Sequence, residues 1–78
     1  MITVDTNVLV RYLISDDLQQ TQEAMDFLAA HDCMILQTVL IELVWVLSSK
    51  TSYNWMREAV VERLRHVLSL PRIWVQEP

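Results

Sequence analysis

The sequence predicts an α/β fold in which helices pack on a short parallel sheet. Three short apolar runs, at residues 2–4, 33–36 and 73–75, have the length and composition of strands. Segments with helical periodicity separate these runs, two in each interval, so the predicted order of elements is β-α-α-β-α-α-β. Strands that alternate with helices are typical of a parallel sheet, and ligands of such folds gather at the carboxyl ends of the strands.

The first strand and the first helix open the chain. Residues 2–4 place Ile and Val two positions apart, and we expect the strand to end near Asp5. Thr6 and Asn7 are good N-cap residues. The apolar residues that fill most of positions 8–14 therefore predict a well-buried helix that follows these caps.

A second helix leads to the middle strand. Asp16 or Asp17 is expected to cap this helix, and His31 to end it. Residues 33–36 then form a continuous apolar run, which predicts a strand that is buried on both faces. Within that strand, Cys33 is expected to be a small core residue.

The second half of the chain repeats this pattern. Residues 39–47 carry one charged side chain, and their apolar run is compatible with a helix or a strand. We favour a helix with Thr38 as its cap, because a strand precedes it. A further helix is expected over about residues 55–70, where Pro71 ends it, and the strand at 73–75 completes the order.

Composition excludes several classes of site. The chain has a single cysteine, so an internal disulfide, a four-thiolate zinc site and an iron–sulfur cluster are excluded, and a reducing cytoplasm is the expected location. It has no glycine, which excludes the P-loop and the dinucleotide-binding fingerprint. Left-handed backbone positions are therefore expected at Asn7, Asp32 or Asn54. We expect no secretory leader, because residues 1–5 lack a basic region, and no membrane span, because the apolar runs are too short.

Charge and hydrophobicity bear on possible partners. The net charge of −4 counts against a broad electrostatic surface for nucleic acid, although acidic residues gathered at a metal site would also lower it. Hydrophobic residues make up 53% of only 78 residues, so some apolar surface is expected to be covered by a second chain. The tryptophans at positions 45, 55 and 74 are expected in the core or at an interface rather than as a platform for stacking bases.

Two carboxylates are expected to converge at one edge of the sheet. Asp5 lies at the carboxyl end of the first strand, and Glu42 lies alone in an apolar helix one turn after the second strand. Neighbouring strands are about 4.8 Å apart, so side chains just beyond their ends can meet. Two such carboxylates repel each other, and a divalent cation such as Mg²⁺ or Mn²⁺ relieves that repulsion.

Each of these residues has a simpler alternative role. Asp5 can serve as a helix N-cap, and Glu42 can lie at the helix rim in water or pair with an arginine. Thr6 can hydrogen-bond to a water on the metal, and Asn7 can orient Asp5, but both can also be caps. The same two alternatives apply to Thr38.

These residues and their order resemble the PIN domain, in particular the VapC group of toxin ribonucleases from bacterial toxin–antitoxin modules. The resemblance rests on Val-Asp-Thr-Asn-Val-Leu at residues 4–9 after a short strand. It also rests on Glu42 in a helix that follows an apolar strand and Thr38, and on the helix and strand that come next. It covers all 78 residues.

The resemblance implies a fold and an activity. The fold is a three-layer α/β/α PIN-like domain, and the activity is that of an endoribonuclease that uses Mg²⁺ or Mn²⁺ to cut single-stranded RNA. Asp5 and Glu42 would be the catalytic metal ligands, and Thr6 and Asn7 would hold the site in place. The bound metal of such enzymes activates a water for attack on the phosphodiester. Such toxins are typically dimers that a cognate antitoxin blocks.

The sequence departs from the family at its carboxyl end. Members of the family continue with a further helix and strand, which bring a third acidic residue at the start of a helix. None of the later acidic residues of this sequence, Glu58, Glu62 and Glu77, matches that acidic motif. We therefore expect residues 1–78 to be one PIN-like domain, incomplete at its carboxyl end. Three interpretations stay open: a nuclease, active through assembly of two chains or descended from an active enzyme; a truncated module that acts by binding protein; and a fragment without a function of its own.

Overall fold

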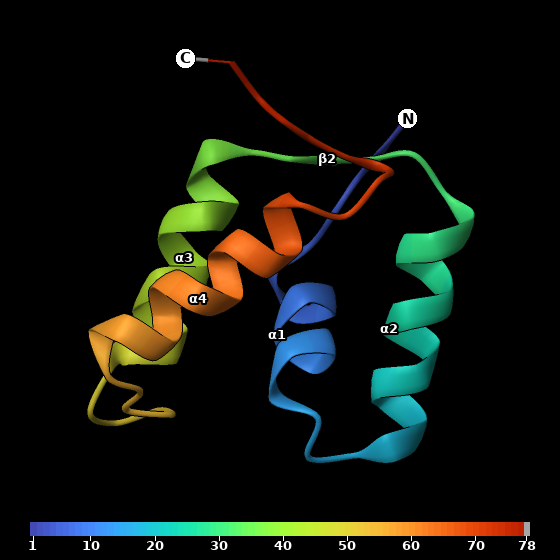
Figure 1. Cartoon of the computed structure of the whole chain (residues 1–78). Helices are drawn as coiled ribbons and strands as arrows, with labels where there is room; N and C mark the ends of the chain where they lie inside the picture. Colours follow the sequence, from blue (N-terminus) through green and yellow to red (C-terminus); the bar gives the residue numbers. More distant parts are fainter. Residues whose placement is uncertain (78) are drawn as a thin grey trace.

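Helices and strands alternate along the chain in the order β-α-α-β-α-α-β, which confirms the predicted α/β class. The structure is a computed structural model that describes residues 1–77 (Figure 1). Its elements are β1 (Ile2–Thr3), α1 (Thr6–Ile14), α2 (Leu18–Ala30), β2 (Cys33–Ile35), α3 (Gln37–Ser48), α4 (Arg57–Leu68) and β3 (Ile73–Val75).

The three strands form a parallel sheet in the order β1-β2-β3. Cys33 pairs with Ile2 on one side and with Ile73 on the other, so β2 is the central strand. Parallel strands cannot be joined by tight hairpins, and the two helical connections α1–α2 and α3–α4 carry the chain back to the start of the next strand. All three strands therefore end at the same edge of the sheet.

The central strand supplies part of the core. Cys33 and Ile35 are completely buried, whereas Met34 between them is only partly buried. The strand is thus less enclosed on one face than its apolar sequence predicts. Burial raises the pKa of the Cys33 thiol, and the nearby Asp32 carboxylate adds to the rise. Cys33 is a core residue, as predicted, and its Sγ donates to the carbonyl of His31 over 3.3 Å.

Helix α1 begins two residues earlier than expected. Asp5 is its N-cap, and its Oδ1 accepts a hydrogen bond of 3.0 Å from the backbone N–H of Asn7. The prediction that Thr6 or Asn7 caps this helix is wrong, because the Asp5 carboxylate already satisfies a free amide of the first turn. Thr6 becomes the first helical residue and is buried.

The caps of α2 and α3 differ in kind. Asp17 caps α2 through a hydrogen bond from the backbone N–H of Gln20, as predicted. Helix α3 has Leu36 at its N-cap position and no local side-chain cap. The prediction of a Thr38 cap is wrong, because α3 begins at Gln37, whose N–H donates instead to the side-chain oxygen of Gln76 beyond β3, 3.2 Å away.

Two non-glycine residues adopt left-handed backbone conformations. Asn54, in the connection between α3 and α4, has a φ of 53°, as predicted. The other is Ser15, with a φ of 59°, where the left-handed conformation ends α1. The corresponding predictions for Asn7 and Asp32 are wrong, since Asn7 lies inside a helix and Asp32 leads directly into β2.

Figure 1 shows α1 between α2 and α3, and α4 beside α3. Leu9 and Leu13 of α1 pack with Leu43 and Leu47 of α3 in a single buried cluster that also includes the central strand. The molecule is a slab, with principal extents of 34 × 33 × 17 Å. A domain only 17 Å thick leaves much apolar surface uncovered.

The tryptophans lie largely outside this core. Trp55 is partly buried, whereas Trp45 and Trp74 have exposed fractions of 63% and 45%. A core position is therefore wrong for Trp45 and Trp74. Among the described residues, no helix is long and apolar enough to cross a membrane.

The burial of Cys33 generates a prediction about its reactivity. The thiolate is the reactive form, and the raised pKa keeps the thiol protonated over the neutral range. We expect an aromatic disulfide reagent to modify native Cys33 much more slowly than the denatured chain at the same pH, with a native rate set by opening of the structure. Native and denatured chains that react equally fast would contradict the buried position of β2.

Candidate active site

A hydrogen bond joins the start of α1 to the middle of α3, beyond the carboxyl edge of the sheet. Thr6 Oγ1, in the first residue of α1, donates to Glu42 Oε2 in α3 over 2.8 Å. The two residues are far apart in sequence, and the parallel pairing of β1 with β2 brings their helices together. Thr6 is buried and its hydroxyl therefore needs a partner, which Glu42 provides. Thr6 thus orients a carboxylate directly, and its predicted contact with a water on a metal stays a prediction.

Asp5 precedes Thr6 in the segment between β1 and α1, at the carboxyl edge of the sheet. Its carboxylate is exposed, and one oxygen is engaged by the backbone N–H of Asn7. The capping alternative for Asp5 is therefore correct, but it does not exclude a second role. A carboxylate has about four acceptor positions and the cap uses one of them. The contact between Asn7 and Asp5 runs through the backbone of Asn7.

Thr38 and Glu42 lie one turn apart on the exposed side of α3. Residues four positions apart on a helix are neighbours, so Thr38 is close to the Glu42 carboxylate without capping the helix. The helix buries Leu43 and Leu47 on its other side. Because the core covers only that side of α3, Glu42 lies on the exposed side together with the apolar side chains Ile41, Val44 and Trp45.

Glu42 has no arginine partner. Within residues 1–77 the ion pair formed is between Arg72 and Asp32, whose atoms Nε and Oδ1 are 2.9 Å apart, at the opposite end of the strands. The alternative in which an arginine pairs with Glu42 is thus excluded. The other alternative, a carboxylate at the helix rim, agrees with its exposure.

The chemistry of the donors suits a hard divalent cation. Mg²⁺ keeps several of its waters and is commonly held by one or two carboxylates together with substrate phosphates. Asp5 and Glu42 have the required oxygens, are accessible, and carry no neutralising cationic side chain. Nowhere in residues 1–77 do three or more His, Cys, Asp or Glu side chains gather as a possible metal site. The residues therefore fit a sparse, water-rich site and do not form an all-protein cage.

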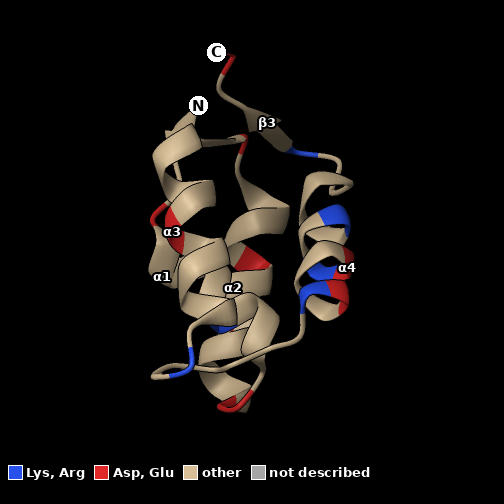
Figure 2. Cartoon of the chain, turned by 90° about the vertical axis from the view of Figure 1, so that its left-hand side faces the viewer, with Lys and Arg blue, Asp and Glu red and all other residues tan. Residues whose placement is uncertain are grey.

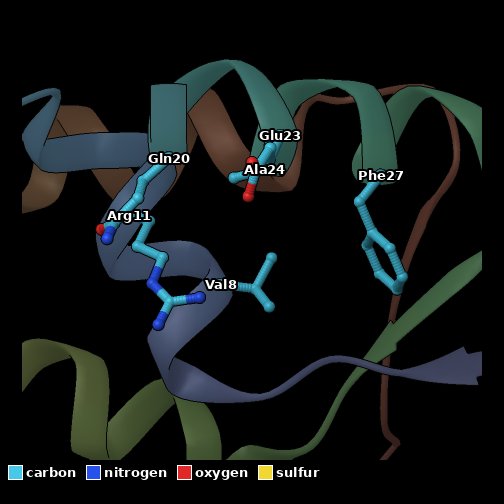
Figure 3. A pocket seen from close by; sticks show the side chains of 6 residues that line it. All are labelled: Val8, Arg11, Gln20, Glu23, Ala24 and Phe27. Carbon is cyan, nitrogen blue, oxygen red and sulfur yellow. The ribbon is translucent and has the colours of Figure 1, made fainter. Parts of the chain in front are cut away.

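A cavity elsewhere in the molecule does not compete for this role. It has a volume of about 160 Å³ and lies between α1 and α2 (Figure 3). Val8 and Phe27 point into the space between the helices, and Arg11 borders it. Typical small-molecule sites measure about 300–1,000 Å³. Neither Asp5 nor Glu42 lines this cavity, so it is separate from the candidate site at the sheet edge.

Basic and acidic residues alternate along α4, which carries three of the six Lys and Arg residues. Figure 2 shows basic and acidic residues interspersed along α4. The residues responsible are Arg57, Glu58, Glu62, Arg63 and Arg65. Nucleic acid bound at the carboxylate edge would therefore receive little attraction from a basic surface, as the net charge of −4 indicates.

Two hydrogen-bonding contacts between distant segments were not predicted from the sequence. Gln76 accepts from the N–H of Gln37 and so ties the segment after β3 to the start of the helix that carries Glu42. Tyr12 Oη and His66 Nε2 are 2.5 Å apart, and this contact links α1 to α4. No local sequence signal identifies either contact, because the partners come from distant segments.

The hydrogen bond between Thr6 and Glu42 yields a stability prediction. Thr6→Val keeps the side-chain shape but removes the hydroxyl, and we expect a loss of about 1 kcal/mol in unfolding free energy. In a domain of this size that loss lowers the Tm by about 4–8 °C, which thermal denaturation followed by circular dichroism measures.

The matched control is Thr38→Val on the exposed side of α3, which should change the unfolding free energy by less than about 0.5 kcal/mol. Equal Tm values for the two variants and the unaltered chain would show that the Thr6 hydroxyl contributes nothing to the fold.

Comparison with known families agrees with this geometry. The sequence model of the PIN domain matches residues 2–77, and the chain belongs to the PIN domain family. The family consists generally of nucleases, typically metal-dependent. No curated protein matches the chain with significant similarity.

Proposed function

We propose that this PIN domain is a metal-dependent endoribonuclease of the VapC toxin type. The observation that carries the proposal is the hydrogen bond from Thr6 to Glu42, because it holds the Glu42 carboxylate beside the end of β1, where Asp5 also lies. Membership of a family of nucleases supports the reaction class. The choice of RNA and the toxin role rest on the resemblance of residues 4–9, Thr38 and Glu42 to that group.

Each residue of the candidate site has a defined role in this proposal. Asp5 and Glu42 hold Mg²⁺ or Mn²⁺ and are the catalytic carboxylates. Thr6 orients Glu42, and the backbone N–H of Asn7 orients Asp5, so that both carboxylates are held in place before the substrate arrives. Thr38 lines the approach along α3. The cation, when bound, supplies activation of water and neutralisation of phosphate charge.

The same proposal extends to partners and location. The substrate is single-stranded RNA, the regulator is a cognate antitoxin protein, and the site of action is the cytoplasm. The exposed apolar residues of the slab, among them Ile41 and Met56, support assembly into a homodimer or a higher oligomer. Assembly of two chains would also bring two pairs of Asp5 and Glu42 together if the pairs face each other.

A second function is favoured by one observation. No cluster of three or more metal-ligating side chains is found in residues 1–77, and a chain with two such carboxylates can also act purely by binding. In this alternative the domain is a non-catalytic module that binds protein or oligomerises. The two functions differ in whether metal and Asp5 are needed.

The decisive test of catalysis is cleavage of a mixed structured RNA by the purified chain. We expect cleavage with Mn²⁺ or Mg²⁺, none in EDTA, and a loss of at least about 100-fold in Asp5→Asn and Glu42→Gln, the range typical of essential acid–base or electrostatic groups. Asp5→Asn is a clean variant because asparagine caps helices about as well as aspartate, so α1 should stay intact.

Asp5→Ala provides the matched control for the capping role. It removes the cap as well as the charge and should cost about 1 kcal/mol in unfolding free energy, whereas Asp5→Asn should cost much less. RNA cleavage that persists in Asp5→Asn would point to a contaminating ribonuclease and refute the proposed enzyme. Unchanged affinity for a protein partner in EDTA and in Asp5→Asn, without cleavage, would favour the binding module.

The oligomeric state gives an independent prediction. We expect the chain to form a dimer or a larger assembly at micromolar concentration, because isolated domains of this size rarely expose so many large apolar side chains. Light scattering coupled to size-exclusion chromatography measures the mass. A monomeric mass together with cooperative unfolding would refute the assembly.

A further inference from the structure

Helix α3, which carries Glu42, has no N-cap side chain of its own. Leu36 occupies the N-cap position, and its apolar side chain cannot accept a hydrogen bond from the free backbone N–H groups of the first turn. The starts of α1 and α2 are each held by an aspartate at this position. The start of α3 therefore depends on a contact from elsewhere in the chain.

Gln76 provides this contact from beyond β3. Its Oε1 accepts a hydrogen bond of 3.2 Å from the backbone N–H of Gln37, the first residue of α3. Its own backbone N–H donates to the carbonyl of Ile35, the last residue of β2, over 2.9 Å. One residue thus binds both the end of the central strand and the start of the helix that follows it.

The register of the sheet explains why residue 76 reaches this point. Ile35 pairs with Val75 in the parallel pairing of β2 with β3, so the next residue of each segment brings Gln76 beside Leu36. In Figure 1 the carboxyl-terminal segment, drawn in red, leaves the sheet toward the side of α3. The side chain of Gln76 therefore offers a carbonyl oxygen where Leu36 has none to offer.

Two hydrogen bonds hold α3, one from each side of the central strand. Gln76, after β3, holds the first backbone N–H of the helix, and Thr6, after β1, holds the Glu42 carboxylate over 2.8 Å. The two points are five residues apart, which is about 7.5 Å along the helix axis. The fully buried residues of α3, Leu43 and Leu47, lie only beyond Glu42. Displacement of the first turn therefore changes the position of Glu42 relative to Thr6.

We propose that Gln76 is a positioning residue for Glu42. It acts as an N-cap from a distant segment and holds α3 so that the Glu42 carboxylate meets the Thr6 hydroxyl. The inference deepens the proposed function, on which the catalytic role of Glu42 rests. The dependence of the contact between Thr6 and Glu42 on Gln76 can be measured without that function.

The first test is a double-mutant cycle between Gln76 and Thr6, measured by urea unfolding. Gln76→Ala removes the acceptor at the start of α3, and Thr6→Val removes the donor to Glu42. If Gln76 keeps Glu42 within reach of Thr6, the two losses are not additive. We expect Thr6→Val to change the unfolding equilibrium constant at least about twofold less in the Gln76→Ala chain than in the unaltered chain.

Two further variants separate positioning from a general loss of stability. Gln22→Ala removes another exposed glutamine contact, the 2.8 Å hydrogen bond to Asp26 within α2, and its effect should add to that of Thr6→Val. Gln76→Glu keeps an acceptor next to a helix N-terminus and should restore the full effect of Thr6→Val. Equal effects of Thr6→Val with and without Gln76 overturn the proposal, and so does a Gln76→Glu chain that behaves like Gln76→Ala.

Hydrogen exchange tests the cap itself. Gln76→Ala should speed exchange of the Gln37 amide roughly 2- to 30-fold relative to amides in the middle of α2, the range for loss of an N-cap. An unchanged exchange rate at Gln37 would show that Gln76 does not hold the start of α3 and would overturn the proposal.

The proposed function can fail separately. In an active enzyme, Gln76→Ala should raise the Mn²⁺ concentration needed for RNA cleavage about 2- to 5-fold and leave kcat at saturating Mn²⁺ unchanged, because fewer chains hold Glu42 in place. An unchanged Mn²⁺ requirement would overturn the positioning role. Absence of metal-dependent cleavage by the unaltered chain, with the coupling between Gln76 and Thr6 intact, would refute the enzyme and leave the positioning of Glu42.

Discussion

The central position of β2 is the constraint on which the rest of the structure depends. Cys33 pairs with a strand on each side, and both pairings are parallel. Parallel pairing requires a long crossover before each new strand, and the two pairs of helices meet this requirement. It also brings the ends of all strands to one edge. The location of every candidate site residue follows from that geometry.

The hydrogen bond between Thr6 and Glu42 turns this shared edge into a defined arrangement. Thr6 is buried at the start of α1, and its hydroxyl reaches across to a helix that begins beyond the neighbouring strand. Asp5 caps α1 through one carboxylate oxygen, and this contact holds the carboxylate in place. Gln76, from the end of the described chain, holds the start of α3. The site is therefore supported by three segments that are far apart in sequence.

A thin molecule with few basic residues must bind its partners by contacts other than broad electrostatic attraction. The slab is 17 Å thick and displays large apolar side chains, while acidic residues outnumber basic ones by ten to six. These properties favour contacts through apolar surface. The exposed side of α3 displays such surface beside Glu42, in the side chains of Ile41, Val44 and Trp45.

The sequence by itself determined the order of elements and the parallel sheet, because alternation and apolar periodicity are local properties of the chain. The convergence of Asp5 and Glu42 at the edge of that sheet stays a prediction. The tertiary structure decided what each polar group contacts. Thr6 donates a hydrogen bond to Glu42, and Asp5 rather than Thr6 caps α1. The side chain of Gln76, and not that of Thr38, accepts a hydrogen bond from the first backbone N–H of α3. Trp45 is exposed because the core side of α3 is filled by Leu43 and Leu47. Such choices depend on partners brought together by folding, and no local pattern encodes them.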